Sequence, residues 1–194
     1  MQSAPPAAKA ARRATYQDVL NAPPHHVAEI VDGTLYTHPR PAARHAWASS
    51  GLGASLVPPF SYGRGGPGGW WIVFEPELHL GDDILVPDLA GWRRTRMPVY
   101  PDTAYFTLAP DWVCEVLSPS TRALDQGAKR AGYAREGVRY LWFVDPDARR
   151  LEAFALRAGQ WVLLETLAGT AAVSLPPFAA ISFSLGDLWP EAGT

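Results

Sequence analysis

The feature that most constrains the fold is one charged residue inside an apolar run, Glu115 within DWVCEVLSPSTRALDQGAKRAGY, residues 111–133. The first part of this stretch is typical of a buried strand, and the part from about Ser120 to Arg135 predicts an amphipathic helix. Alternate strand side chains point to opposite faces, so Val113, Glu115 and Leu117 share one face. The neighbouring positions are apolar, as expected for a strand covered on both sides. A charge there is costly unless something compensates it.

The following helix offers candidate partners for this carboxylate. Asp125, Lys129 and Tyr133 are spaced i, i+4, i+8 and therefore lie on one helix face. Because the helix starts where the strand ends, its inner face can pack over the sheet, and the long stem of Lys129 can lie on apolar surface. Simpler interpretations stay open: a salt bridge from Glu115 to any nearby Arg or Lys, an exposed Asp125–Lys129 ion pair contributing less than about 1 kcal/mol, and a Tyr133 that only packs.

The rest of the chain predicts an α+β fold, with a mixed sheet and the long helix set among its strands. TYQDVLNAPP predicts a short helix capped by Thr15, with Asp18 three residues later. VAEIV and TLYTH, joined by Asp-Gly, predict a hairpin, and His45 opens a second helical segment. WWIVFEPELHL and ILVPDLAGWR predict two long strands, and further strands follow residue 138. We expect a flexible tail over residues 1–13 and one domain over 14–194.

Composition narrows the function classes. The chain has 194 residues and is 47% hydrophobic, so a folded domain is expected. Its net charge is −2, so we expect no broad basic surface for binding nucleic acid. Cys114 is the only cysteine, which fits a reducing cytoplasm. No apolar stretch is long enough for a membrane span. SYGRGGPGG lacks the Gly-Lys-Ser/Thr ending of a phosphate-binding loop.

Two further acids are expected to face each other across the WWIVFEPELHL–ILVPDLAGWR hairpin. If Gly81-Asp82 forms its turn, Glu77 meets Val86 and Glu75 meets Asp88. Directly opposed acids repel unless a cation lies between them. Asp88, Glu115 and the carbonyl of Val116 could then hold Mg²⁺ with several waters remaining.

Together with Lys129, this set matches the needs of metal-assisted phosphodiester hydrolysis. The metal would activate a water and neutralise charge on the phosphate oxygens, and an ammonium would stabilise the same charge.

The residues VPDLAGW (86–92), EVLSPST (115–121) and DQGAKRAGYAREGVRYLWFVDP (125–146) resemble the Uma-type restriction endonuclease family of the PD-(D/E)XK nuclease superfamily. The EIVDGTLY hairpin, a histidine near position 45 and ISFSLGDLW resemble it too, so the likeness covers nearly the whole chain from about residue 15. It implies a restriction-endonuclease-like mixed sheet with an N-terminal hairpin and helix extension.

The resemblance also implies roles. Asp88 matches the first acidic motif and Glu115 the second, and the two would bind Mg²⁺, with Mn²⁺ as an alternative. The usual superfamily lysine position, two residues after Glu115, is Leu117, and Lys129 from the helix substitutes for it in the Uma-type pattern.

Secondary candidates keep two interpretations each. Glu75 or Glu77 is either a third metal ligand or part of a hairpin salt bridge, and Glu29 either acts in the site or pins the N-terminal hairpin. His45 is either a general base or a contact at the helix start. His25, His26 and His38 are expected to be exposed, and most tryptophans to be core or dimer contacts.

The leading hypothesis is therefore a Mg²⁺-dependent DNA endonuclease. The alternative is a catalytically silent member of the same fold that binds nucleic acid or protein, and a third possibility is a structural ion network without a ligand. A homodimer is expected if both DNA strands are cut.

Overall fold

The computed structural model describes residues 12–39 and 42–190. Most of the tail predicted over residues 1–13 lies outside this part of the chain. Its last two residues are described, and their side chains form ion pairs, Arg12 with Asp18 at 2.7 Å and Arg13 with Asp82 at 3.5 Å. The α+β fold predicted from the sequence is confirmed.

The helical segments are α1 (Tyr16–Leu20), α2 (Ala43–Leu56), η1 (Val57–Ser61), α3 (Arg122–Leu124), η2 (Asp125–Lys129), α4 (Arg130–Arg135) and η3 (Leu185–Leu188). The strands are β1 (His26–Val31), β2 (Thr34–Pro39), β3 (Trp70–Phe74), β4 (Leu78–Leu80), β5 (Asp83–Leu85), β6 (Leu89–Arg93), β7 (Trp112–Val116), β8 (Tyr140–Asp145), β9 (Arg150–Arg157), β10 (Gln160–Ala168), β11 (Ala172–Val173) and β12 (Phe183–Ser184).

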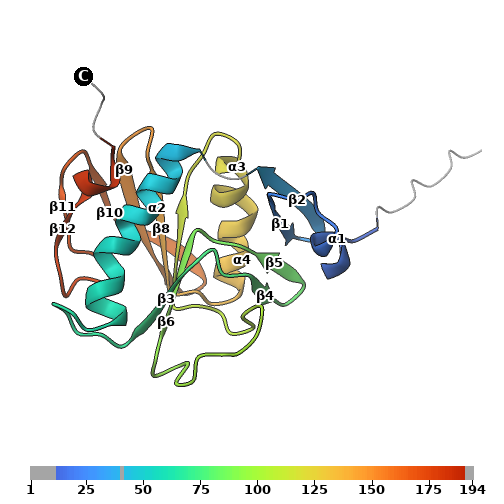
Figure 1. Ribbon diagram of the computed structural model, residues 1–194, viewed down its shortest axis with the longest axis horizontal. Helices are drawn as coiled ribbons and strands as arrows, with labels where there is room; N and C mark the ends of the chain where they lie inside the picture. The colour runs from blue at the N-terminus through green and yellow to red at the C-terminus, as the bar shows by residue number, and fades with distance from the viewer. Residues whose placement is uncertain (1–11, 40–41, 191–194) are drawn as a thin grey trace, which may run out of the picture.

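A six-stranded mixed sheet forms the centre, in the order β10-β9-β8-β7-β6-β3. Strands β7 and β8 are parallel, so the chain needs a crossover between them, and the helical segment α3-η2-α4 provides it. The other pairs in this sheet are antiparallel. Helix α2 and the crossover helix lie on opposite sides of the strands (Figure 1).

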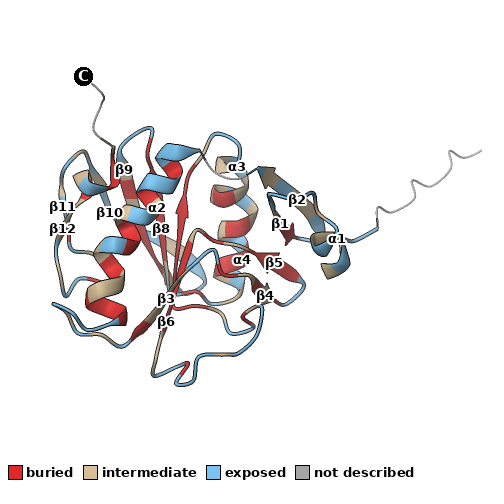
Figure 2. Ribbon diagram, in the orientation of Figure 1, coloured by how far each residue is buried: buried red, intermediate tan, exposed pale blue. Residues whose placement is uncertain are grey.

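Strand β7 is buried along its whole length, as its apolar pattern predicts (Figure 2). Trp112 and Cys114 belong to the core under α2, whereas Val113 and Leu117 belong to the core under the crossover helix. The predicted alternation is therefore confirmed, and it directs Glu115 towards the crossover helix.

The two long strands predicted around the Gly81-Asp82 turn are each broken into two. Their register is as predicted, since Leu78 pairs with Leu85 and the Glu75 N–H donates to the Asp88 carbonyl at 3.0 Å. The prediction that each strand runs without a break was wrong. Glu75 has a φ of 43° and is followed by Pro76, and Pro87 interrupts the opposite strand. The hairpin bends there because proline lacks the N–H that a ladder needs.

The bend divides the hairpin between two sheets. Strands β3 and β6 stay in the central sheet, whereas β4 and β5 join a four-stranded sheet in the order β2-β1-β5-β4. This second sheet brings the N-terminal hairpin against the crossover helix (Figure 1). At the bend the Val86 carbonyl accepts from Lys129, and the Asp88 side chain accepts from the Val116 N–H at the end of β7.

The local signals in the N-terminal part are confirmed. Thr15 and Asp18 form the predicted capping box at α1. Asp32 and Gly33 make the hairpin turn with φ values of 50° and 77°, which suits the Asp-Gly pair. In α2, Gly53 allows a close approach, because a Cβ there would lie 1.9 Å from the ring of Phe74.

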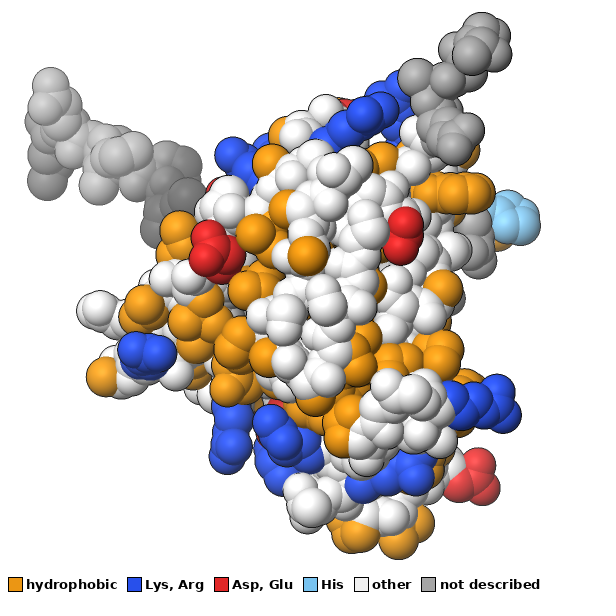
Figure 3. All heavy atoms as spheres, turned by 90° about the vertical axis from the view of Figure 1, so that its left-hand side faces the viewer, with side chains coloured by type: hydrophobic (Ala, Val, Ile, Leu, Met, Phe, Trp, Pro, Cys, Tyr) orange, Lys and Arg blue, Asp and Glu red, His pale blue; other side chains and the backbone are white. Residues whose placement is uncertain are grey.

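The surface carries no continuous basic band on the face shown in Figure 3, where Lys and Arg side chains form separate small groups among hydrophobic and uncharged atoms. Within residues 12–39 and 42–190, no helix has the length and apolar character needed to cross a bilayer.

Candidate active site

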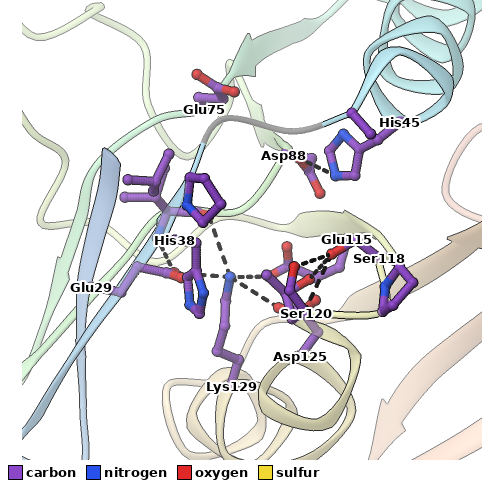
Figure 4. Close-up of a pocket in the computed structure, with 16 residues that line it drawn as sticks. Glu29, His38, His45, Glu75, Asp88, Glu115, Ser118, Ser120, Asp125 and Lys129 are labelled. Carbon is purple, nitrogen blue, oxygen red and sulfur yellow. Dashed lines mark hydrogen bonds and ion pairs between the residues drawn. The ribbon is translucent and has the colours of Figure 1, made fainter. Parts of the chain in front are cut away.

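A cavity of about 320 Å³ opens where the N-terminal hairpin, the start of α2, the strand bend and the crossover helix meet. Five acidic side chains and one lysine line it, and we call it the acidic pocket. The acids are Glu29, Glu75, Asp88, Glu115 and Asp125, and the lysine is Lys129. Figure 4 shows how these side chains lie.

The ammonium of Lys129 is the centre of the buried part of the pocket. It lies 2.9 Å from Glu115 Oε1, 2.8 Å from Glu29 Oε1 and 3.4 Å from Asp125 Oδ1. It also donates to the Val86 carbonyl at 3.3 Å. The Lys129 side chain is only 3% exposed. The helix therefore does reach back to the strand acid, and the interpretation of Asp125–Lys129 as an exposed ion pair was wrong.

The helix geometry helps to gather these groups. Asp125 and Lys129 are the first and last residues of η2, a π-helical turn inside the crossover helix. Such turns are uncommon and are frequent at functional sites. One turn later, Tyr133 donates a hydrogen bond to Glu115 Oε1 at 2.5 Å, so it does more than pack.

Acidic groups outnumber basic groups in this buried cluster, and the pKa values of Lys129 and Glu115 are shifted as a result. Burial alone would lower the pKa of Lys129, but Glu115, Glu29 and Asp125 together raise it well above its usual value, so the ammonium stays charged. Burial raises the pKa of Glu115 well above its usual value; Lys129 opposes this rise, and the nearby acids add to it. The single ammonium of Lys129 thus contacts three carboxylates at once.

Glu29, on β1 of the N-terminal hairpin, links this hairpin to the Lys129 cluster. Besides contacting Lys129, its Oε1 accepts the Val86 N–H at 2.7 Å, and the residue is 3% exposed. Of the two interpretations for Glu29, the contact with Lys129 favours a place in the site. The same contacts also pin the hairpin.

Asp88 and His45 form a second group beside the Lys129 cluster (Figure 4). His45 Nε2 lies 3.1 Å from Asp88 Oδ1, and Asp88 Oδ2 accepts the Val116 N–H at 2.7 Å. The other ring nitrogen, Nδ1, is buried without a hydrogen-bond partner among the described residues. Burial alone would lower the pKa of His45, but Asp88, Asp125 and the Val116 backbone together raise it.

The two candidates for a third acid differ in where they lie. Glu77 does not line the acidic pocket, and its Oε1 lies 2.7 Å from His79 Nε2, as in the hairpin salt-bridge interpretation. Glu75 lines the pocket, but its carboxylate points away from Lys129 (Figure 4).

His38 was predicted to be exposed, but it lines the acidic pocket. His25 and His26 are exposed as predicted, whereas His38 is only partly exposed, lines the pocket and has a buried Nε2 without a described partner. No sequence signal marks it, because its position depends on how the hairpin packs.

The donor set suits a hard divalent cation of the Mg²⁺ type. Among the described residues, no three His, Cys, Asp or Glu side chains converge as a complete ligand set. Mg²⁺ does not need one, since it usually keeps several waters and takes one or two carboxylates. The surplus of acids over cations in the pocket is the observation that fits such an ion.

Comparison with known proteins places the chain in a family. The family model described as "Uma2: Putative restriction endonuclease" matches residues 14–186. The chain belongs to the Uma2 family. The resemblance expected from VPDLAGW, EVLSPST and the lysine-bearing helix is thereby confirmed. No curated protein sequence matches the chain.

A solved structure with the same fold is similar to this chain. It is described as a "putative nuclease belonging to DUF820" from Anabaena variabilis ATCC 29413. It superposes with a TM-score of 0.71 at 23% identity, covering 90% of this chain and 97% of the other. At that identity the likeness concerns the fold, and the predicted restriction-endonuclease-like architecture is confirmed.

Proposed function

We propose that the protein is a metal-dependent DNA endonuclease that hydrolyses phosphodiester bonds in the acidic pocket. The observation that carries the proposal is the buried arrangement of Glu115 and Lys129, 2.9 Å apart, beside Asp88 at the strand bend. The family description supports a nuclease of restriction type.

Asp88, Glu115 and the Val116 carbonyl would hold the ion, with Mg²⁺ preferred and Mn²⁺ as an alternative. A divalent ion here would activate a water and neutralise charge on the phosphate. The contacts of Glu115 with Lys129 and Tyr133 both end on Oε1, which leaves Oε2 for the ion. His45 and the Val116 N–H hold the two oxygens of Asp88 and fix its orientation.

The protein groups around the ion have separable tasks. Lys129 holds Glu115 in place and supplies positive charge beside the phosphate, and Glu29 positions Lys129 through its own 2.8 Å contact. His45 is the candidate general base for the attacking water, and its Nε2 contact with Asp88 fixes the orientation of the ring.

Plasmid cleavage tests the proposal. Wild type with Mg²⁺ or Mn²⁺ should nick or linearise supercoiled plasmid, and Asp88→Asn should lower the rate by at least about 100-fold, in line with the loss of several kcal/mol of metal assistance. Glu77→Gln is the matched control, because this acid belongs to the same hairpin but lies outside the pocket. It should cleave like wild type.

The same assay separates the alternatives. Wild type that binds DNA without cleaving it under either metal would instead support a catalytically silent member. A homodimer stays a prediction, because cutting both strands requires two sites. Sedimentation of the protein with and without DNA measures it.

A further inference from the structure

A second cavity, of about 340 Å³, lies at the free edge of the central sheet, where β3 has no further strand beside it. It is formed by β3, by η1 with the residue that follows it, and by the segment after β6. Its lining is aromatic and basic, and we call it the aromatic–arginine groove. The residues are Val57, Ser61, Tyr62, Trp71, Ile72, Val73, Phe74, Arg94 and Tyr100.

Three rings in this groove are partly open to solvent. Tyr62 is 65% exposed, and Phe74 and Tyr100 are each 46% exposed. Trp71 also lines the groove; its indole N–H donates to the Met97 carbonyl at 2.9 Å, and its ring centroid is 5.3 Å from that of Tyr100. Trp71 and Tyr100 are thus held against each other, and Tyr62, Phe74 and Tyr100 each keep part of the ring exposed.

Arg94, which lines the groove, and Arg64, which lies next to it, contact rings or carbonyls instead of acids. The Arg94 guanidinium lies 3.8 Å from the centre of the Trp71 ring and donates to the Ser61 carbonyl at 2.8 Å. Arg64 lies over the Tyr62 ring at 5.2 Å. Neither has a carboxylate partner among the described residues, and no acid lines the groove. Their positive charge is therefore available to an anionic ligand.

The groove also leads to the acidic pocket. Phe74 lines the groove and the next residue, Glu75, lines the pocket, so β3 runs from one to the other. A chain lying along this edge would reach the site where we place the phosphodiester chemistry.

We propose that the aromatic–arginine groove binds an unpaired strand of DNA next to the cleavage site. Exposed rings on which bases stack, combined with positive charge along the backbone path, are the features of single-strand binding surfaces. A duplex would keep its bases paired and offer no faces to these rings. The inference rests on the proposed function for its substrate, but it concerns binding and not the chemical step.

Fluorescence anisotropy with a short labelled oligothymidylate, in EDTA and without divalent metal, tests the inference. Tyr62→Ala and Tyr100→Ala should each weaken binding about 5-fold or more, as expected for loss of one stacking partner. Trp47→Ala is the matched control, because this ring is 53% exposed on α2 but does not line the groove. It should bind like wild type.

The charge contribution is tested by salt dependence. Arg64→Gln should reduce the slope of log Kd against log salt by about 0.7, the value for one phosphate contact on a single strand. Arg157→Gln, at the exposed end of β9, should leave the slope unchanged. Urea unfolding of each variant confirms that binding is compared between folded proteins.

Tighter binding of the single strand than of the matched duplex, lost in both tyrosine variants, supports the inference. It is overturned if wild type prefers the duplex, or if both tyrosine variants bind the oligonucleotide like Trp47→Ala. Because no cleavage is measured, a protein that fails the plasmid assay still gives a result here.

Discussion

The acidic pocket and the aromatic–arginine groove are lined by consecutive residues, Glu75 and Phe74, yet their charged side chains have opposite kinds of partners. In the pocket, Lys129 is 3% exposed and is surrounded by three carboxylates. In the groove, Arg94 is held by the Trp71 ring and the Ser61 carbonyl, and beside it Arg64 lies over the ring of the groove residue Tyr62. Charges fixed in the interior are suited to chemistry, because they need no reorganisation during the reaction. Charges without acid partners at the surface are suited to holding a polyanion.

The largest contrast should be in stability. Lys129→Met leaves Glu29, Glu115 and Asp125 buried without their cation, so we expect the free energy of unfolding to fall by about 3–5 kcal/mol. Arg64→Met, at an exposed position in the groove region, should change it by less than about 0.5 kcal/mol. Urea denaturation measures both, and similar values for the two variants would break the comparison.

A smaller effect, on turnover, is expected when a pocket carboxylate is replaced by an amide of the same shape. Glu29→Gln retains an oxygen for the Val86 N–H but weakens the hold on Lys129. We expect turnover to fall about 10-fold, as for other residues that orient a catalytic group, with KM unchanged. Glu77→Gln serves as the control, and a Glu29→Gln enzyme with wild-type turnover would show that Glu29 only pins the hairpin.

The smallest effect concerns the anchor of the crossover helix. Arg122, at its start, lies 2.8 Å from Asp145 at the end of β8. Burial would raise the pKa of Asp145, but the hydrogen bonds from Arg122 and the Ala148 N–H outweigh it and lower that pKa. The associated stability is present above the usual Asp pKa of about 3.9 and is lost as pH falls through the lower folded value.

Asp145→Asn should therefore cost about 1 kcal/mol near neutral pH and less as the pH approaches the folded pKa. Urea unfolding at a series of pH values below 6 would show it. A constant difference between wild type and variant across this range would contradict the assignment.

The sequence predicted those parts of the site that depend on local periodicity. The alternation around Glu115 and the i, i+4, i+8 spacing of Asp125, Lys129 and Tyr133 were enough to direct these side chains towards one another. The pairing of Glu75 with Asp88 followed from the turn length.

The parts that were missed depend on contacts distant in the sequence. The pairing of Glu29 with Lys129 spans 100 positions and depends on how the N-terminal hairpin packs, which periodicity does not encode. The bend at Pro76 and Pro87 had a signal in the prolines, but the alternating pattern on either side suggested continuous strands. The π-helical turn η2 has no sequence mark.

Calorimetric titration with Mn²⁺ and Mg²⁺ tests the central claim most directly, that Asp88 and Glu115 share one ion. Wild type should bind one ion per chain, and Asp88→Asn and Glu115→Gln should each weaken that binding by at least about 10-fold, while Glu77→Gln binds like wild type. Absence of metal binding to wild type, or undiminished binding by either pocket variant, would contradict the account.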